Sequence, residues 1–100
     1  MAGAMMTEPR SVVVGVDTHS DVHVAVALTD LGERVSSISV PTTPTGLHRL
    51  LSWAEALGDV ACFGIEGPGS FGATLHRYLS KSGHEVIEVS RPRSSNRVGR

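Results

Sequence analysis

Two carboxylates in this sequence, Asp17 and Glu66, each stand at the end of a short apolar segment that has the length of a β-strand. Asp17 closes the run VVVGV at 12–16, and Glu66 closes the run VACFGI at 60–65. Neighbouring strands lie about 4.8 Å apart, and if these two strands are parallel neighbours, two carboxylates at that spacing repel each other unless a proton or a cation lies between them. Mg²⁺ or Mn²⁺ is the natural partner of such oxygen ligands, and a pair of these ions supports phosphodiester cleavage. Asp17 and Glu66 are therefore candidate metal ligands and candidate catalytic residues.

A simpler interpretation applies to any acid that directly follows a strand. Such a residue often only forms a turn or caps a helix, and for Asp17 or Glu66 alone this interpretation is the stronger one. Two acids at the ends of neighbouring strands shift the preference toward a shared site. Complete coordination of a metal ion usually takes more carboxylates than the two found here at strand ends.

Other candidate donors give weaker signals. The segment DTHSDVH at 17–23 holds His19, His23 and two aspartates, but a hairpin does not bring them to one point, so solvated or structural histidines are favoured. The GPGS segment at 67–70 precedes a helix and could hold a phosphate through its backbone N–H groups. It lacks the lysine of a P-loop, so a tight turn is favoured. Cys62 lies inside a strand and is interpreted as a core residue.

The apolar pattern predicts an α/β fold with the element order β-β-β-α-β-α-β. The expected strands are 12–17, 21–28, 33–40, 60–66 and 85–89, and the expected helices are 44–57 and 71–81. The continuous run 12–16 is typical of a strand covered on both faces, whereas the alternation in 22–28 indicates a half-exposed strand. Crossovers between parallel strands are nearly always right-handed, so the fourth strand should lie beside the first in a mixed sheet of order 3-2-1-4-5. This is the ribonuclease-H-like arrangement, here incomplete at its C-terminus.

The composition limits the class of protein. One hundred residues with 40% hydrophobic content make one small domain that has its own core. The formal net charge of −1 gives no overall attraction to nucleic acid or to a membrane, although the last ten residues hold four arginines. No apolar run approaches the roughly 20 residues that span a bilayer. The single cysteine excludes an internal disulfide and fits a cytoplasmic protein. The expected division is a disordered leader at 1–10, a domain at 11–92 and a basic tail at 93–100.

Two segments together resemble a known family. VGVDTHSDVHVAVAL at 14–28 and FGIEGPGSFGATLHRYLSKSGHEVIEVSRP at 63–92 resemble the N-terminal domain of the DEDD-type transposases of the insertion-sequence-110 family. The catalytic domain of that family is similar to RuvC Holliday-junction resolvases. The resemblance implies DNA transposition and recombination through Mg²⁺-dependent strand cleavage and exchange, guided by an element-encoded RNA and carried out by a homo-oligomer. Asp17 and Glu66 match the first two of the family's four acids.

The sequence also departs from the family pattern. The resemblance places two further aspartates, and then a domain with a serine nucleophile, beyond Pro92, where this sequence reads RSSNRVGR. It therefore implies an N-terminal catalytic-domain fragment that does not cut DNA by itself. An alternative is a non-catalytic module that pairs with full-length transposase or with guide RNA and interferes with transposition. A third hypothesis, half of an actin-like or sugar-kinase-like ATPase, needs a second glycine-rich phosphate hairpin that the sequence lacks.

Overall fold

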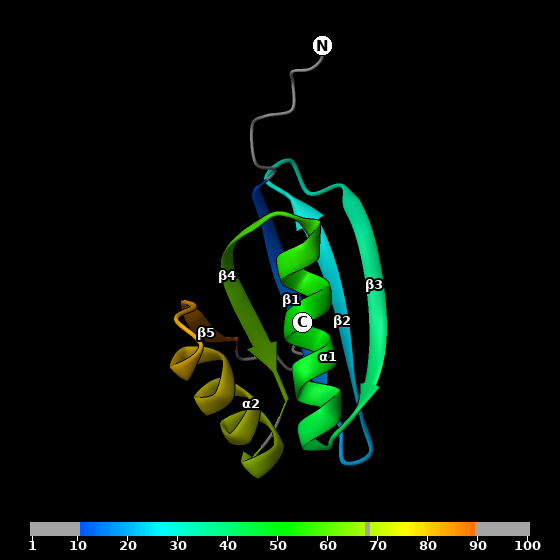
Figure 1. Ribbon diagram of the computed structural model, residues 1–100, viewed down its shortest axis with the longest axis vertical. Helices are drawn as coiled ribbons and strands as arrows, with labels where there is room; N and C mark the ends of the chain where they lie inside the picture. Colours follow the sequence, from blue (N-terminus) through cyan, green and yellow to red (C-terminus); the bar gives the residue numbers. More distant parts are fainter. Residues whose placement is uncertain (1–10, 68, 90–100) are drawn as a thin grey trace, which may run out of the picture.

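The computed structural model describes residues 11–67 and 69–89, which form one mixed five-stranded sheet and two helices (Figure 1). In chain order the elements are β1 (Ser11–Thr18), β2 (Val22–Thr29), β3 (Arg34–Pro41), α1 (Pro44–Leu57), β4 (Asp59–Glu66), α2 (Gly69–Lys81) and β5 (Val86–Val89). This order confirms the predicted one, and each boundary lies within two residues of its expected position. The expected leader and basic tail fall outside the described residues.

The strand order is β3-β2-β1-β4-β5, as the sequence predicts. β1 and β2 pair antiparallel, as do β2 and β3, whereas β4 pairs parallel with β1 and β5 pairs parallel with β4. The parallel pair β1–β4 therefore lies at the centre of the sheet. The two parallel strands that end in carboxylates are neighbours.

Both helices lie on the same face of the sheet (Figure 1). Each helix links parallel strands, and both links step across the sheet in the same direction, so a constant connection hand places them on one side. Burial along β1 alternates accordingly: Val12, Val14 and Val16 are at most 2% exposed beneath the helices, whereas Val13 is 36% exposed on the other face. The prediction that the valine run is covered on both faces is wrong for the part of the chain that the structure describes. We call the two sides the helix face and the open face.

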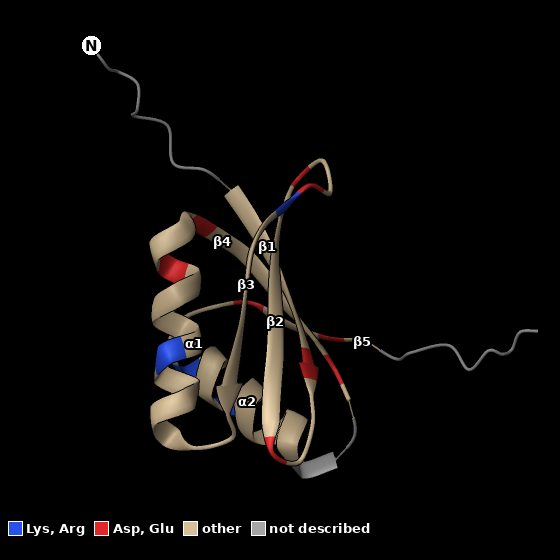
Figure 2. Cartoon of the chain, turned by 90° about the vertical axis from the view of Figure 1, so that its right-hand side faces the viewer, with Lys and Arg blue, Asp and Glu red and all other residues tan. Residues whose placement is uncertain are grey.

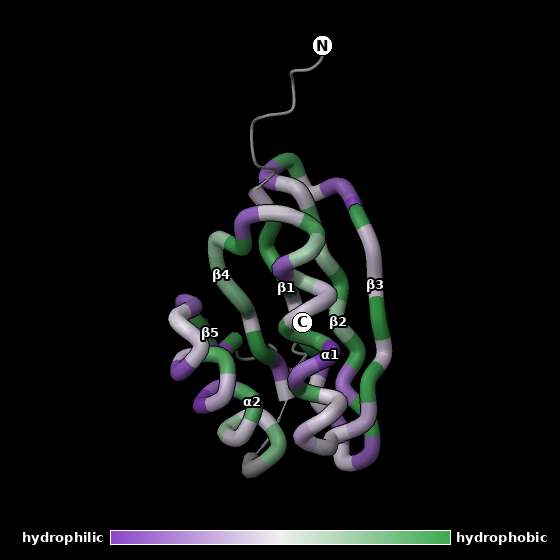
Figure 3. Tube along the Cα trace, in the orientation of Figure 1, coloured by the Kyte–Doolittle hydropathy of each residue, from purple (hydrophilic) through white to green (hydrophobic). Residues whose placement is uncertain are grey.

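The core lies between the helices and the helix face. It comprises Val12, Val14, Val16, Ala25, Ala27, Val40, Leu47, Leu50, Ala54, Phe63, Ile65, Leu75 and Leu79. Figure 3 shows hydrophobic stretches along the central strands and hydrophobic residues within both helices. On β2 the helix face carries His23 and the small residues Ala25 and Ala27, and the larger valines lie on the open face. The strand is half-exposed, as its alternation indicates.

The first helix begins and ends at residues whose types favour these positions. The Thr43 side chain accepts a hydrogen bond from the Gly46 N–H at 3.0 Å, and Pro44 occupies the first turn, where its missing N–H costs nothing. Gly58 ends the helix with a φ of 153°, which L side chains rarely adopt. Among the described residues, no helix is long and apolar enough to cross a membrane.

Candidate active site

Asp17 and Glu66 are register partners at the C-terminal ends of the parallel strands β1 and β4. The residues just before them, Val16 and Ile65, are buried on the helix face, so the alternation of strands sends both carboxylates to the open face. Both side chains are half-buried, and that of Asp17 is 42% exposed. The predicted adjacency of the two acids at one sheet end is thus confirmed. We call them the acid pair.

The backbone at the acid pair is held by a close contact between the two strand ends. Thr18, which is 2% exposed, donates its hydroxyl to the Glu66 carbonyl oxygen at 3.2 Å. Gly67 follows with a φ of 137°, and a Cβ at this position would overlap the Thr18 side-chain oxygen. Glycine is therefore required where the chain leaves β4. The sequence indicated a turn here but gave no sign of its contact with Thr18.

A pair of glycines forms the floor of the open face next to the acid pair. Gly15 and Gly64 are register partners two residues before the two carboxylates, so they share the face to which the carboxylates point. A Cβ at Gly15 would meet no atom within 4 Å. A Cβ at Gly64 would contact the Val89 side chain at 3.4 Å. The backbone of Gly15 is therefore the part of this pair that a chain-like ligand can approach closely.

Among the described residues, the strands around the acid pair carry acidic but no basic side chains. None of the strands β1, β4 and β5 contains a lysine or an arginine. Figure 2 shows acidic segments on the side of the sheet away from α1, whereas most of the described Lys and Arg residues lie on the helices. These described strands therefore offer a phosphate group no positively charged side chain.

His19 lies beside Asp17. Its Nε2 atom is 3.2 Å from Asp17 Oδ2, and the two side chains are 54% and 42% exposed. An ion pair this exposed contributes little to stability, because water screens it. The sequence favoured a solvated or structural role for this histidine, and the contact makes it a neighbour of the acid pair in the hairpin turn.

His23 lies on the opposite side of the sheet from the acid pair. It is the register partner of Thr18 and is only 2% exposed on the helix face, and its Nδ1 atom is buried without a hydrogen-bond partner. Burial, reinforced by the nearby His19, lowers the pKa of His23 below the ordinary value of 6.5. The donors of the segment 17–23 are therefore divided between two faces. Within the described ranges, no group of three or more His, Cys, Asp or Glu side chains could hold a metal ion.

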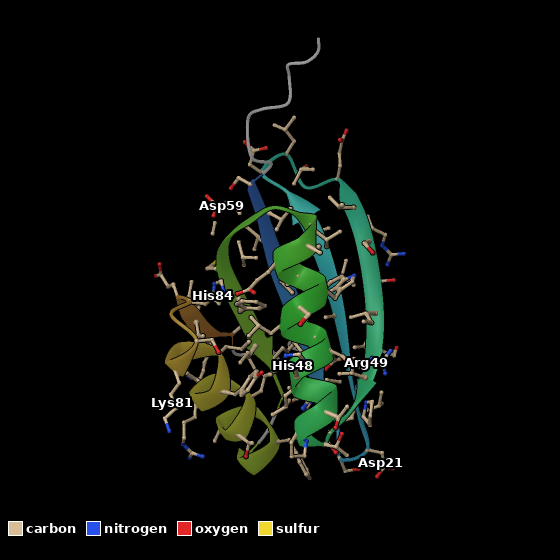
Figure 4. The ribbon with its side chains drawn as sticks, in the orientation of Figure 1. Asp21, His48, Arg49, Asp59, Lys81 and His84 are labelled. Carbon is tan, nitrogen blue, oxygen red and sulfur yellow. The ribbon has the colours of Figure 1, made fainter. Side chains whose placement is uncertain are left out.

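Two other histidines contact carboxylates away from this end of the sheet. His84 Nε2 is 2.7 Å from Glu55 Oε2, and its ring packs edge-on against Phe63 at 5.2 Å. His76 Nδ1 is 3.0 Å from Glu88 Oε2. Figure 4 shows His84 well apart from Asp21, which marks the turn between β1 and β2. The sequence offers no signal for these pairs, because each joins residues from separate elements.

The predicted core role of Cys62 is only partly met. The alternation of β4 places Cys62 on the open face, where it is half-buried and is the register partner of Val13. The side chains at 69 and 70 lie outside the described part of the chain, so the interpretation of the GPGS segment as a tight turn rather than a phosphate loop stays a prediction.

Two of three comparisons with known proteins find matches to this chain. The family model of the DEDD transposases of insertion sequence 110, described as "Transposase", matches residues 14–100. A comparison with curated protein sequences finds no match.

Among solved structures, the chain is similar to Archaeoglobus fulgidus Pelota, with a TM-score of 0.55, 16% identity, and coverage of 80% of this chain and 27% of that one. It is also similar to a ROK family protein from Streptococcus pneumoniae solved with sucrose, with a TM-score of 0.51, 16% identity, and coverage of 79% and 34%. Ribonuclease H1 from Halobacterium salinarum gives a TM-score of 0.51 at 12% identity, and coverage of 86% and 89%. At these identities the likeness concerns the fold alone, which is ribonuclease-H-like. The chain spans about a third or less of the length of the Pelota and ROK proteins.

Proposed function

The chain belongs to the insertion-sequence-110 family of DEDD transposases, and on this premise we propose that Asp17 and Glu66 are two of its catalytic carboxylates and that together they bind Mg²⁺ or Mn²⁺. Membership in the family assigns the chain to DNA transposition in general. The metal site and the cleavage and exchange of DNA strands are the parts that we propose.

The observation that carries the proposal is the register of Asp17 with Glu66 on one face. The pair presents two half-buried carboxylates at neighbouring strand positions, and their oxygens would hold a hard divalent cation bound there. Carboxylate oxygens are the ligands that such a cation prefers. In the family pattern this pair supplies two of four acids, so it forms one part of a larger site.

The chemistry follows from the positions of these groups. A divalent ion bound at the acid pair supplies Lewis-acid activation of water and neutralises a phosphodiester. The protein's own residues determine where the phosphodiester lies. A Cβ at Gly15 would meet no atom within 4 Å, so the open face leaves room for a strand beside Asp17, and the described strands β1, β4 and β5 contribute no Lys or Arg to it.

The experiment that tests the proposal is a Mn²⁺ titration of the full chain followed by amide NMR. Paramagnetic broadening should appear first around residues 15–19 and 64–67, and Asp17→Asn or Glu66→Gln should abolish it. Asp59→Asn is the matched control, because Asp59 is an exposed carboxylate at the opposite end of β4. Broadening that is unchanged in Asp17→Asn would show that the acid pair is not the site.

The family makes DNA the expected partner. The guide RNA and the self-association of the intact family member stay predictions drawn from the resemblance. No contact among the described residues favours the alternative of a non-catalytic interfering module, which stays a prediction in the same way.

A further inference from the structure

A small pocket lies on the helix face at the same end of the sheet as the acid pair. It has a volume of about 110 Å³ and is lined by His23 of β2, Thr42 before α1, Leu47 of α1, and Phe71 and Thr74 of α2. We call it the His23 pocket. Its position is fixed by the register, because His23 pairs with Thr18, the residue that directly follows Asp17.

His23 is the feature that marks this pocket as more than a gap between helices. A side chain that is 2% exposed normally satisfies its polar atoms within the protein, yet the Nδ1 atom of His23 makes no hydrogen bond. The imidazole lines the pocket, so an occupant would lie against the ring of a residue that has an unsatisfied nitrogen. The lowered pKa keeps the ring neutral at pH 7, so it offers one donor and one acceptor and gives no attraction for an anion.

The remaining walls fit a flat ring with polar edges. Leu47 and Phe71 supply apolar surface, and Phe71 is 38% exposed at the rim. Thr74 contributes a hydroxyl, and Thr42 donates its own hydroxyl to the Ser20 carbonyl at 3.0 Å while keeping its oxygen as an acceptor. A closed cavity of about 150 Å³ holds benzene, so a partly open pocket of about 110 Å³ suits one six-membered ring rather than a fused pair.

We propose that the His23 pocket binds a single unpaired pyrimidine base of a DNA strand, with His23 as its hydrogen-bonding group and Phe71 as its aromatic wall. This proposal rests on the proposed function, because it concerns the strand that the acid pair would hold. Successive residues of β1 point to opposite faces, so the carboxylate of Asp17 and the pocket beside Thr18 lie on the two sides of one strand end. A nucleic-acid strand that crosses this end of the sheet has a phosphate site on one side and a base site on the other.

The pocket can be tested without metal or DNA. The full chain is titrated with cytidine, uridine, adenosine and ribose while the ring nitrogens of the histidines and the threonine methyl groups are followed by NMR. Cytidine or uridine should shift the signals of His23 and Thr74, adenosine should bind more weakly, and ribose should cause no shift. Thr74→Phe fills the pocket and should weaken pyrimidine binding by about tenfold or more, a loss of about 1.4 kcal/mol. Ser80→Phe adds the same ring at an exposed position on α2 and should leave binding unchanged.

A second arm identifies the source of the base. A single-stranded oligothymidine should shift the same His23 signals as uridine, and the corresponding duplex should not. Binding of the nucleosides but not of the strand would overturn the assignment to DNA. Absence of any His23 shift, equal shifts with ribose, or unchanged binding in Thr74→Phe would overturn the pocket itself. Asp17→Asn should bind pyrimidines normally while losing its response to Mn²⁺, so failure of the metal site and failure of the pocket are distinguishable.

Discussion

Gly67 lies so close to Thr18 that a Cβ on Gly67 would overlap the Thr18 side-chain oxygen. The end of β4 therefore packs directly against the end of β1. The hydroxyl of Thr18 also donates a hydrogen bond to the Glu66 carbonyl oxygen at 3.2 Å. The relative position of the acid pair therefore depends on a residue without a side chain. It also depends on a buried threonine that takes no part in the proposed chemistry.

The first prediction concerns this contact. Gly67→Ala should lower the free energy of unfolding by more than Gly32→Ala, as measured by urea denaturation. Both glycines have positive φ, at 137° and 87°, but a Cβ at Gly32 meets no atom within 4 Å. Gly32→Ala should therefore cost only the backbone strain, about 1–2 kcal/mol, while Gly67→Ala adds the overlap with Thr18. Equal losses of unfolding free energy in the two variants would show that the ends of β1 and β4 move apart to accommodate the Cβ without destabilising the fold.

The second prediction concerns metal binding at the acid pair. Asp17→Asn removes one of the two carboxylates that we propose as metal ligands. Mg²⁺ at ten times its dissociation constant should stabilise the unmodified chain by about 1.4 kcal/mol and should leave Asp17→Asn unchanged. Thermal unfolding with and without Mg²⁺ measures both effects. Asp59→Asn should respond to Mg²⁺ as the unmodified chain does, and a lost response in that variant would point to diffuse binding.

The third prediction concerns His23 and pH. Burial holds its pKa below 6.5 in the folded state, so the unfolded chain binds more protons than the folded one between the two pKa values. The free energy of unfolding therefore has its full contribution from neutral His23 above pH 6.5. This contribution is lost as the pH falls from 6.5 through the pKa of His23 in the folded state. Replacing His23 with Gln should remove this part of the pH dependence, as measured by urea denaturation at a series of pH values. His48→Gln, at an exposed position of α1, should keep it. The measured quantity is the slope of the unfolding free energy against pH. A general loss of stability in His23→Gln lowers the free energy at every pH and leaves this slope unchanged.

The fourth prediction concerns the open space above Gly15 beside the acid pair. Gly15→Val should fold at least as stably as the unmodified chain, because valine favours strands and a Cβ at this position meets no atom within 4 Å. The same change should weaken Mg²⁺-dependent association with single-stranded DNA, because the isopropyl group stands where the strand would lie. Fluorescence anisotropy measures the association. Ser11→Val, on the same face at the far end of β1, should bind as the unmodified chain does. A normal affinity in Gly15→Val would place the strand elsewhere.

The topology and the acid pair could be predicted because each follows from a local pattern combined with a general rule. Apolar runs that end in Asp17 and Glu66 mark two strands, and the hand of crossovers makes these strands neighbours. The helix at 44–57 follows from its cap, Thr43, and from the proline after it. None of these inferences requires knowledge of which side chains touch.

The coverage of the sheet could not be predicted in the same way. A run of valines at 12–16 shows that the strand is apolar, but it does not show how many faces the helices cover. The alternation in 22–28 likewise places His23 and the valines on opposite faces of the strand. It does not indicate which of these faces packs against the helices. The buried imidazole of His23 and the contact of Thr18 with Gly67 both depend on register, and register emerges only when the whole sheet is assembled.

The arrangement of both helices on one side of the sheet has a consequence for handling the protein. In the part of the chain that the structure describes, Val13, Ile87 and Val89 are 36%, 47% and 48% exposed, and they lie together with the half-buried valines of β2 and with Cys62 on an uncovered apolar layer. We expect such a layer to bind fluorescent hydrophobic dyes even when the domain is natively folded, and to favour self-association at high concentration. Preparations of this domain are therefore best kept dilute, and dye fluorescence is a poor criterion of its unfolding.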